Sequence, residues 1–333
     1  MRHKTTLTAR NTAFLALAAA CVTACETQPA KDESAARAVE APANPSRDAR
    51  APVAAGPVPP GAALTPAPVE RAGPTPPGPQ VAAPAAPTQG MLAGFEILVP
   101  GTTAKLVLAP IPAAEVQAAD GTRASVAPFL AATTEITWDM YDAFVFAMER
   151  AETEKDPPDA FARPSKPYIL MDRGFGHAGY PVISVSFRGA TQFCRWLSNR
   201  TGKHFRLPTE AEWTHAARGG IATDPDAAAL DASTWYQPNS KTRGRLSTHP
   251  VGKKAANGYG LHDVLGNAAE WTVGAEGKGV LRGGSFKDPA EKAALSARLP
   301  DDPAFNATDP QIPKSVWWLA DGPFAGFRVV CDP

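Results

Sequence analysis

The chain has 333 residues, and its 33 basic and 33 acidic side chains give a formal net charge of zero. Without excess positive charge a chain is not expected to capture a polyanion, so the composition argues against nucleic-acid binding. Hydrophobic residues make up 44% of the chain, enough for a buried core, and its 35 prolines are spread unevenly. This distribution predicts one folded domain preceded by a tether.

Residues 1–25 have the pattern of a secretory signal. Basic residues precede a short apolar run at 13–20, which is too short to span a bilayer. The run leads into VTAC at 22–25, which resembles the lipobox of bacterial lipoproteins, where the signal is cut before a cysteine that then carries lipid. We therefore expect lipid on Cys25, with Cys21 as a weaker candidate and an ordinary cleaved signal as the alternative.

Residues 26–90 are nearly all Ala, Pro, Gly and scattered charge. A segment with so few large apolar side chains cannot bury enough surface to offset its chain entropy. Its proline density predicts a disordered, extended spacer that holds the folded domain away from a membrane. The folded domain is expected at 91–333.

The first part of that domain is predicted to contain strands and a helix. FEILVPG at 95–101 and AKLVLAPIP at 104–112 are rich in Val, Leu and Ile and are bounded by Pro or Gly, as strands are. Residues 126–132 suit a third strand. Thr137 is a plausible N-cap for a helix that places Trp138, Tyr141, Phe144 and Val145 on one face.

Two further helices are predicted by their end signals. In the first, Ser186 is the expected N-cap and Gly202 follows the end. In the second, Thr209 and Glu212 form a T-x-x-E capping box, and a Gly-Gly pair at 219–220 ends the helix. Residues 221–333 read mostly as turns and short strands, and an irregular, aromatic-rich segment of this kind is expected to need pinning by a metal or a disulfide.

An ordered set of motifs then identifies a family resemblance. The motifs are TTEITWDMY (133–141), PVISVS (181–186), FCRWL (193–197), RLPTEAEW (206–213), NGYGLHDVLGNAAEWT (257–272), LRGGSF (281–286) and GFRVV (326–330). Together they resemble the formylglycine-generating enzyme family, also called the sulfatase-modifying factor family. The resemblance implies a single α/β (α+β) domain of the complex C-type-lectin-like kind, with little regular secondary structure and structural Ca²⁺.

The family's oxidases hold copper between two cysteines that follow the RGGS turn. Thiolates are the soft ligands that select Cu(I), and the matching positions here are Asp288 and Ala293. Neither residue supplies sulfur, so copper is not expected and no catalytic residue is assigned. The histidines likewise show no two-His-one-carboxylate spacing for a non-haem iron centre.

The resemblance places the family's Ca²⁺ site in GLHDVLGNAAEW. The implied ligands are Asp263 and the backbone carbonyls near Val264, Gly266 and Ala268, supported by Glu270, since Ca²⁺ prefers six to eight oxygen ligands. The alternative is a tight turn in which polar side chains cap backbone groups. A second family Ca²⁺ site would involve Asn239.

Cys194 and Cys331 are the cysteines of the folded part. The family often joins these two positions by a disulfide, and an exported protein occupies an oxidising space. A disulfide is therefore expected, with two buried free thiols as the alternative.

A ligand cleft beside the RGGS turn is the remaining candidate site. Its candidate residues are Arg282, Ser285, Arg298, Trp317 and Trp318, although loop-holding ion pairs are the default role of such arginines. Adjacent tryptophans on a strand face opposite sides, so one of the pair is expected in the core and one at the surface. The alternative is that both pack over the irregular half of the domain.

These observations predict a lipid-anchored protein of the bacterial cell envelope with a domain that is not an oxidase. The expected role is binding or scaffolding, with the family cleft holding a peptide or glycan of an envelope partner. The alternative is an enzyme that acts on an exported protein by a mechanism without the copper-cysteine pair.

Overall fold

Strands from the beginning, middle and end of the domain form a five-stranded sheet. The computed structural model describes residues 92–117, 123–220 and 225–333, so the predicted signal, tether and Cys25 lipidation site lie outside the described residues. The order is β1-β2-β5-β13-β6, with antiparallel neighbours throughout. The strands are β1 (Phe95–Leu98), β2 (Lys105–Ile111), β5 (Phe129–Ala132), β13 (Val330–Cys331) and β6 (Phe205–Arg206).

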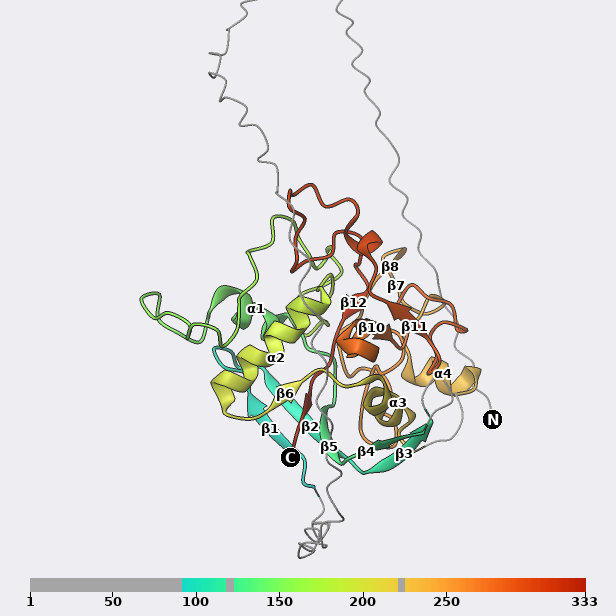
Figure 1. The fold of residues 1–333 in the computed structure, drawn as a ribbon. Helices are drawn as coiled ribbons and strands as arrows, with labels where there is room; N and C mark the ends of the chain where they lie inside the picture. The colour runs from blue at the N-terminus through green and yellow to red at the C-terminus, as the bar shows by residue number, and fades with distance from the viewer. Residues whose placement is uncertain (1–91, 118–122, 221–224) are drawn as a thin grey trace, which may run out of the picture. The chain divides into compact units, whose positions relative to one another are not determined.

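A second sheet carries the motifs of the C-terminal half. Its order is β11-β10-β9-β12, and β12 runs parallel to β9. The strands are β9 (Ala269–Val273), β10 (Gly279–Arg282), β11 (Arg298–Pro300) and β12 (Ala325–Gly326). Two hairpins complete the strands, β3 (Ala114–Gln117) with β4 (Arg123–Val126) and β7 (Lys241–Thr242) with β8 (Arg245–Leu246). Short strands joined by long loops dominate the domain (Figure 1), as the sequence predicts.

Four α-helices are present in the described residues: α1 (Trp138–Phe146), α2 (Phe187–Thr201), α3 (Glu210–Arg218) and α4 (Ala227–Ser233). The predicted caps of α2 and α3 are confirmed, since Ser186 accepts a hydrogen bond from the amide of Gly189 and Thr209 and Glu212 form the capping box. Thr137 begins α1 without a side-chain cap bond. Helix α4, in which the Asp226 side chain accepts a hydrogen bond from the Ala229 amide, was not predicted from the sequence.

One predicted strand boundary is wrong. The expected strand at 126–132 is two strands, because β4 ends at Val126 and β5 begins at Phe129. Pro128 lies between them, and proline has no amide hydrogen to donate to a ladder. The chain therefore turns at 127–128 and joins a different sheet.

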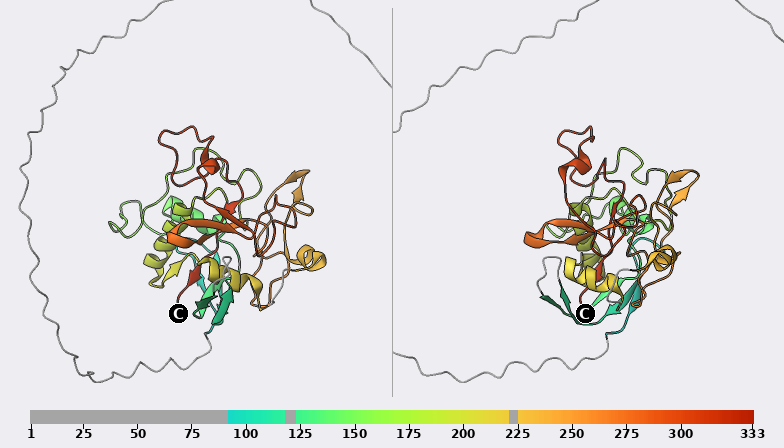
Figure 2. Two further views of the ribbon diagram at one scale, coloured as in Figure 1. Left: turned by 45° about the vertical axis from the view of Figure 1, so that its right-hand side comes forward. Right: turned by 90° about the vertical axis from the view of Figure 1, so that its right-hand side faces the viewer.

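The main core lies between the five-stranded sheet, α1, α2 and β9. Its largest fully buried side chains are aromatic and come from segments far apart in sequence, including Tyr141, Phe193, Trp196, Trp271 and Phe327. Both views of Figure 2 place the β7–β8 hairpin and the 301–320 loop on the side of the domain away from the C-terminus. Within the described residues, no helix is long and apolar enough to cross a membrane.

Candidate functional site

The RGGS turn packs closely against the backbone at Val264 and at Lys292. Gly283 and Gly284 both have positive φ, +85° and +70°, a conformation that side chains with a Cβ rarely adopt. A Cβ on Gly283 would lie 2.6 Å from the carbonyl oxygen of Val264, and one on Gly284 would lie 2.2 Å from that of Lys292. The double glycine therefore lets the turn pack directly against backbone.

The positions that hold copper in the family's oxidases have structural contacts here. Ser285 Oγ donates to Asp288 Oδ2 at 2.7 Å, and the Asp288 carbonyl accepts from the Gln237 amide at 2.9 Å. Ala293 is 1% exposed and packs in an apolar cluster with Trp213, Ala217, Leu230, Tyr236, Leu265 and Leu295. A carboxylate and a buried methyl group do not fit a Cu(I) site, which requires soft sulfur ligands.

The predicted disulfide between Cys194 and Cys331 is not formed in the structure. Both residues are buried free cysteines, on α2 and β13. The Cys331 thiol instead donates to the carbonyl oxygen of Asp332 at 3.3 Å. Burial raises the pKa of both thiols, which keeps them protonated and unreactive.

A buried ionic centre occupies the region of the predicted calcium site. Arg328 donates to both carboxylate oxygens of Glu270 at 2.6–2.9 Å, and Trp213 Nε1 donates to Glu270 Oε2 at 2.7 Å. Glu135 accepts from the Asn267 side chain and the Ala268 amide. Glu270 is therefore committed to a guanidinium, which corrects its expected role in supporting a cation.

Asp263 differs from Glu270 because one of its oxygens is free. Its Oδ2 accepts from the Gly252 amide at 2.6 Å, whereas its Oδ1 is buried and has no partner among the described residues. Burial raises the pKa of this carboxyl group. An unpartnered buried carboxylate oxygen is suited to serve as one ligand of a cation. No cluster of three or more acidic, His or Cys residues that could hold a metal occurs in the described ranges.

The side chain of Asn239 locks a turn rather than offering a cation ligand. Its Oδ1 accepts from the Tyr236 amide at 3.0 Å, and its Nδ2 donates to Asp231 Oδ1 and to the Thr234 carbonyl, both at 3.1 Å. Asn239 therefore stabilises this turn in the structure, and the second Ca²⁺ site stays a prediction.

Most of the predicted cleft residues hold the fold instead. Arg282 is 4% exposed and bonds Glu210, Thr214 and the carbonyl oxygens of Leu295 and Ala297. Arg298 pairs with Glu210 at the surface, at 2.8–3.0 Å. Ser285 is fully buried. These three positions are corrected from cleft residues to structural ones.

The two tryptophans differ in burial, and both pack against the main core. Trp318 is 2% exposed, stacks on Trp138 with ring centroids 6.4 Å apart, and donates from Nε1 to the Ser165 carbonyl. Trp317 is half-buried, and the guanidinium of Arg188 lies 5.0 Å from its ring centroid. Of the five predicted cleft residues, Trp318 alone is among the described residues that line the cavities considered below.

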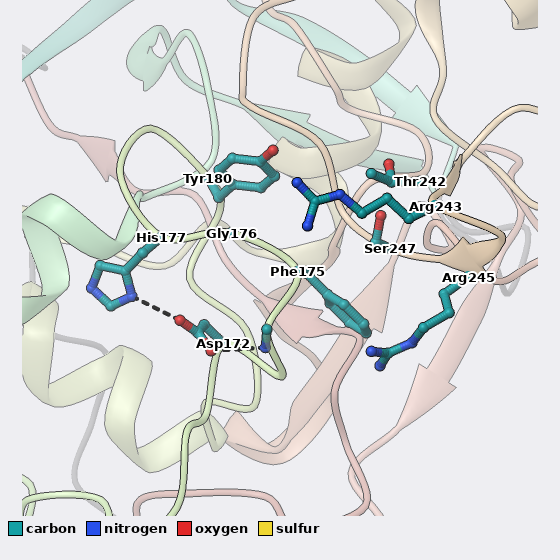
Figure 3. A pocket seen from close by; sticks show the side chains of 10 residues that line it. Asp172, Phe175, Gly176, His177, Tyr180, Thr242, Arg243, Arg245 and Ser247 are labelled. Atoms are coloured by element: carbon teal, nitrogen blue, oxygen red, sulfur yellow. Dashed lines mark hydrogen bonds and ion pairs between the residues drawn. The ribbon is translucent and has the colours of Figure 1, made fainter. Parts of the chain in front are cut away.

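An open cavity of about 520 Å³ lies beside the RGGSF turn (Figure 3). The segment 172–180 forms one wall and the β7–β8 hairpin with Ser247 forms the other. We call it the basic cavity, and it is lined by Asp172, Gly174, Phe175, Gly176, His177, Tyr180, Thr242, Arg243, Arg245 and Ser247. The Phe175 ring packs edge-on against Phe286, with centroids 5.2 Å apart, which links this cavity to the turn.

The cavity has two arginines on its hairpin wall and Asp172 and His177 on the opposite wall. Figure 3 shows Arg243 extending toward the Tyr180 side of the cavity and Arg245 toward Phe175. The Arg245 guanidinium lies 5.7 Å from the Phe175 ring centroid. Neither arginine forms an ion pair with a carboxylate in the part of the chain that the structure describes.

His177 is held between two carboxylates at the edge of the basic cavity. Its Nε2 lies 2.7 Å from Asp142 Oδ2 and its Nδ1 lies 3.1 Å from Asp172 Oδ2, while its ring stacks on Trp138 with centroids 5.1 Å apart. Burial disfavours the charged imidazolium, but the two carboxylates outweigh it and raise the pKa of His177. The three side chains form a fixed partition between two cavities.

The second cavity, also about 520 Å³, lies on the other side of this partition. We call it the apolar cavity. It shares Asp172 and His177 with the basic cavity and is otherwise lined by Trp138, Asp142, Val145, Phe146, Pro167, Tyr168, Ile169, Leu170, Met171 and Trp318. Leu170 is 77% exposed and Phe146 is 46% exposed. Neither the 171–180 segment nor the β7–β8 hairpin was identified from sequence, because neither carries a recognisable motif.

Most of the chain is similar to one known protein family. The model of the sulfatase-modifying factor enzyme 1-like domain matches residues 83–332. The chain belongs to this family. The motifs that predict the family from sequence are thereby confirmed, as is the sulfatase-modifying-factor fold class.

The similar proteins include some named formylglycine-generating enzyme and others named as inactive members of the family. The formylglycine-generating enzyme of Mycobacterium tuberculosis is 40% identical over 107 residues, which is 29% of this chain and 34% of that protein. A Bos taurus protein called inactive C-alpha-formylglycine-generating enzyme 2 is 35% identical over 135 residues, 34% of this chain and 41% of that protein. The matches thus span about a third to two fifths of these relatives.

Among solved structures, Treponema denticola variable protein 1 resembles the chain with a TM-score of 0.53 and 24% identity. The match covers 73% of this chain and all of that one. At this identity the likeness concerns the fold alone.

Proposed function

We propose that this protein is a binding module of the bacterial cell envelope that has the family fold without the family's copper oxidation. The observation that supports it most directly is the replacement of the copper position by structural contacts. Asp288 is hydrogen-bonded by Ser285, and Ala293 is packed in an apolar cluster. An open cavity remains beside the same turn, with Phe175 against Phe286. The domain keeps a place to hold a peptide or glycan while lacking the ligands for copper.

Two measurements on the full-length protein test this proposal. Incubation with Cu(I) and a cysteine-containing sulfatase peptide should leave the peptide unconverted, as measured by mass spectrometry. Crosslinking in intact envelopes followed by pull-down should recover a defined partner whose yield falls when the basic cavity is altered by Arg243→Gln and Arg245→Gln. Stoichiometric copper binding with peptide conversion would overturn the proposal.

A matched variant controls for lost charge. Arg123→Gln with Arg195→Gln removes two exposed arginines outside both cavities and should leave the partner yield unchanged. An equal loss with this pair would mean that overall charge, rather than the cavity, retains the partner.

We also propose that Cys25 carries the lipid that anchors the protein to the membrane. The support is the VTAC sequence at 22–25 after a short apolar run, followed by a Pro/Ala-rich segment. The protein should partition into the detergent phase of a two-phase extraction, and Cys25→Ala should move it to the aqueous phase. Aqueous partitioning of the unaltered protein would contradict the anchor.

A structural calcium ion at Asp263 is a further part of this proposal. The support is the buried, unpartnered Oδ1 of Asp263, which an ion with oxygen ligands would satisfy. Calcium bound there would neutralise the buried carboxylate, and Asp263 Oδ1 would be one of its ligands. The melting temperature should rise with CaCl₂ over EDTA in the unaltered protein and in Asp301→Asn, but not in Asp263→Asn. Equal melting temperatures in CaCl₂ and EDTA would exclude the ion.

A further inference from the structure

The basic cavity contains two arginines that have no carboxylate ion-pair partner among the described residues. Arg243 and Arg245 lie two residues apart on the β7–β8 hairpin, and both are exposed. Figure 3 shows their guanidinium groups directed to different sides of the cavity. Guanidinium groups bind carboxylates through paired hydrogen bonds. The hairpin therefore has the chemistry of an anion site.

A buried hydroxyl group beneath the arginines points independently to a ligand. Ser247 lines the basic cavity and is 3% exposed, and its Oγ has no hydrogen-bond partner among the described residues. A buried polar atom without a hydrogen-bond partner destabilises the fold. Figure 3 shows this hydroxyl on the same side of the cavity as Thr242 and Arg243. An oxyanion bound in this cavity would accept hydrogen bonds from the Ser247 hydroxyl group and from the arginine guanidinium groups.

The apolar cavity favours a different group. Its outer wall consists of Phe146, Ile169 and Leu170, all exposed large apolar side chains. An exposed apolar patch of this kind marks an interaction site. The exposed aliphatic side chains of Ile169 and Leu170 in this wall suit the side chain of Leu, Ile or Phe.

We propose that the two cavities together bind one extended peptide segment of an envelope partner, with an Asp or Glu side chain in the basic cavity and a large apolar side chain in the apolar cavity. The cavities share Asp172 and His177 as a common partition, so their occupants are close neighbours along a chain. In an extended peptide, side chains two residues apart lie on one face, about 7 Å apart. The recognised pattern is therefore an acidic and an apolar residue in an i, i+2 relation. This inference rests on the proposed binding function and specifies its ligand.

Selection from a library of random heptapeptides displayed on phage tests the pattern, with immobilised full-length protein as the target. Selected peptides should be enriched in Asp or Glu two positions from Leu, Ile or Phe. A synthetic peptide with that pattern should bind at least about tenfold more weakly to Arg243→Gln/Arg245→Gln, and its affinity should fall in 1 M NaCl. Replacing its acidic residue by the amide should have no further effect on that variant.

Matched variants assign each half of the peptide to a cavity. Leu170→Ser, at a side chain that is 77% exposed, should remove the apolar preference and keep the acidic one. Arg123→Gln/Arg195→Gln should bind like the unaltered protein. Unchanged acidic enrichment in the Arg243→Gln/Arg245→Gln variant would overturn the inference.

Other outcomes separate this inference from the proposed function. Binding of a glycan array with no peptide selected would refute the peptide ligand and leave the binding function standing. A copper-dependent conversion of the sulfatase peptide would refute the binding function itself. Affinity for free acetate or sulfate equal to that for the peptide would reduce the site to a simple anion site and would also overturn the inference.

Discussion

Arginine occurs in this domain in two opposite settings. Arg328 is 2% exposed, and its guanidinium contacts Glu270 and the carbonyl oxygens of Ala132 and His262. Arg243 and Arg245 lie exposed on a two-strand hairpin at the mouth of a cavity, without a carboxylate partner in the described ranges. The first setting satisfies a buried charge, and the second leaves cationic donors open to a ligand.

The difference shows how an irregular fold stays ordered without the predicted disulfide. The buried ionic centre joins β5, β9 and the GFRVV segment through side-chain and backbone hydrogen bonds. Glu135, whose pKa burial raises strongly, lies at the same centre. Removing one partner of the Arg328–Glu270 pair would leave an uncompensated buried charge, so this pairing helps to hold the three segments together. The basic cavity lacks such pairing, which argues against a structural role for its arginines.

The largest expected effect is on the buried arginine. Arg328→Met should lower the free energy of unfolding by about 3–5 kcal/mol, because it leaves Glu270 buried without its counter-charge. Arg298→Met is the matched control, since Arg298 has a side chain that is 40% exposed and pairs with Glu210 at the surface. It should cost no more than about 1 kcal/mol. Urea unfolding measures both, and similar losses would contradict the distinction between the two settings.

A second ionic cluster, around Arg163, is expected to lose its stabilising effect at acidic pH. Arg163 contacts Glu149 and Asp156 and holds the 147–163 segment to α2 through Arg200. Burial opposes ionisation of Glu149, but hydrogen bonds from Trp196 and Arg163 outweigh it and lower its pKa; the Arg163 hydrogen bond lowers that of Asp156. Such groups stabilise the fold above their unfolded pKa values, and this stability is lost as the pH falls through the lower folded values.

Arg163→Met should therefore lower the free energy of unfolding by about 1–3 kcal/mol at pH 7. The difference from the unaltered protein should shrink at pH 3, which is below the ordinary pKa values of 4.5 for Glu149 and 3.8 for Asp156, because part of the cluster's contribution is lost there. Urea unfolding at the two pH values measures this. A difference that is equal at both would show that Arg163 acts through packing on Phe144 and Phe161, which its guanidinium also faces.

Local signals in the sequence predicted the helices well and the site poorly. Ser186 and Thr209 mark helix starts because a cap bonds amides only two or three residues away. The double glycine at 283–284 likewise specifies its own turn. In contrast, the basic cavity forms where residues near 175 meet residues near 245. No local sequence pattern encodes this tertiary contact between distant segments.

The misassigned arginines have the same cause. Arg282 looked like a cleft residue because it precedes the turn, yet its partners Glu210 and Thr214 lie on α3, about seventy residues earlier. Whether an arginine is paired depends on which distant carboxylate reaches it. The family resemblance predicted the fold. The absence of the copper-binding cysteines at positions 288 and 293 was also visible in the sequence, because it concerns residue type rather than placement.

His177 is intermediate between the two settings, because it is ion-paired and also half exposed. Its expected effect on stability is correspondingly smaller. Its two carboxylates raise its pKa above the ordinary value of 6.5, so its stabilising contribution is complete below that value and is lost as the pH rises through the higher folded pKa. His177→Gln should lower the free energy of unfolding at pH 6 by less than about 1 kcal/mol, because solvent screens the pair. At pH 9 the variant and the unaltered protein should match. A loss that persists at pH 9 would assign the effect to stacking on Trp138.

The smallest expected effect on stability belongs to the open arginines. Arg243→Gln with Arg245→Gln should change the free energy of unfolding by no more than about 0.5 kcal/mol, because neither side chain has a carboxylate partner in the described residues to lose. The same variant should lose the increase in melting temperature that a selected acidic peptide gives the unaltered protein, since only ligand binding depends on these groups. A stability loss comparable to that of Arg163→Met would place both arginines in the structural setting. Unaltered stability together with lost peptide stabilisation assigns them to the ligand, because a residue that supports the fold cannot be removed without cost.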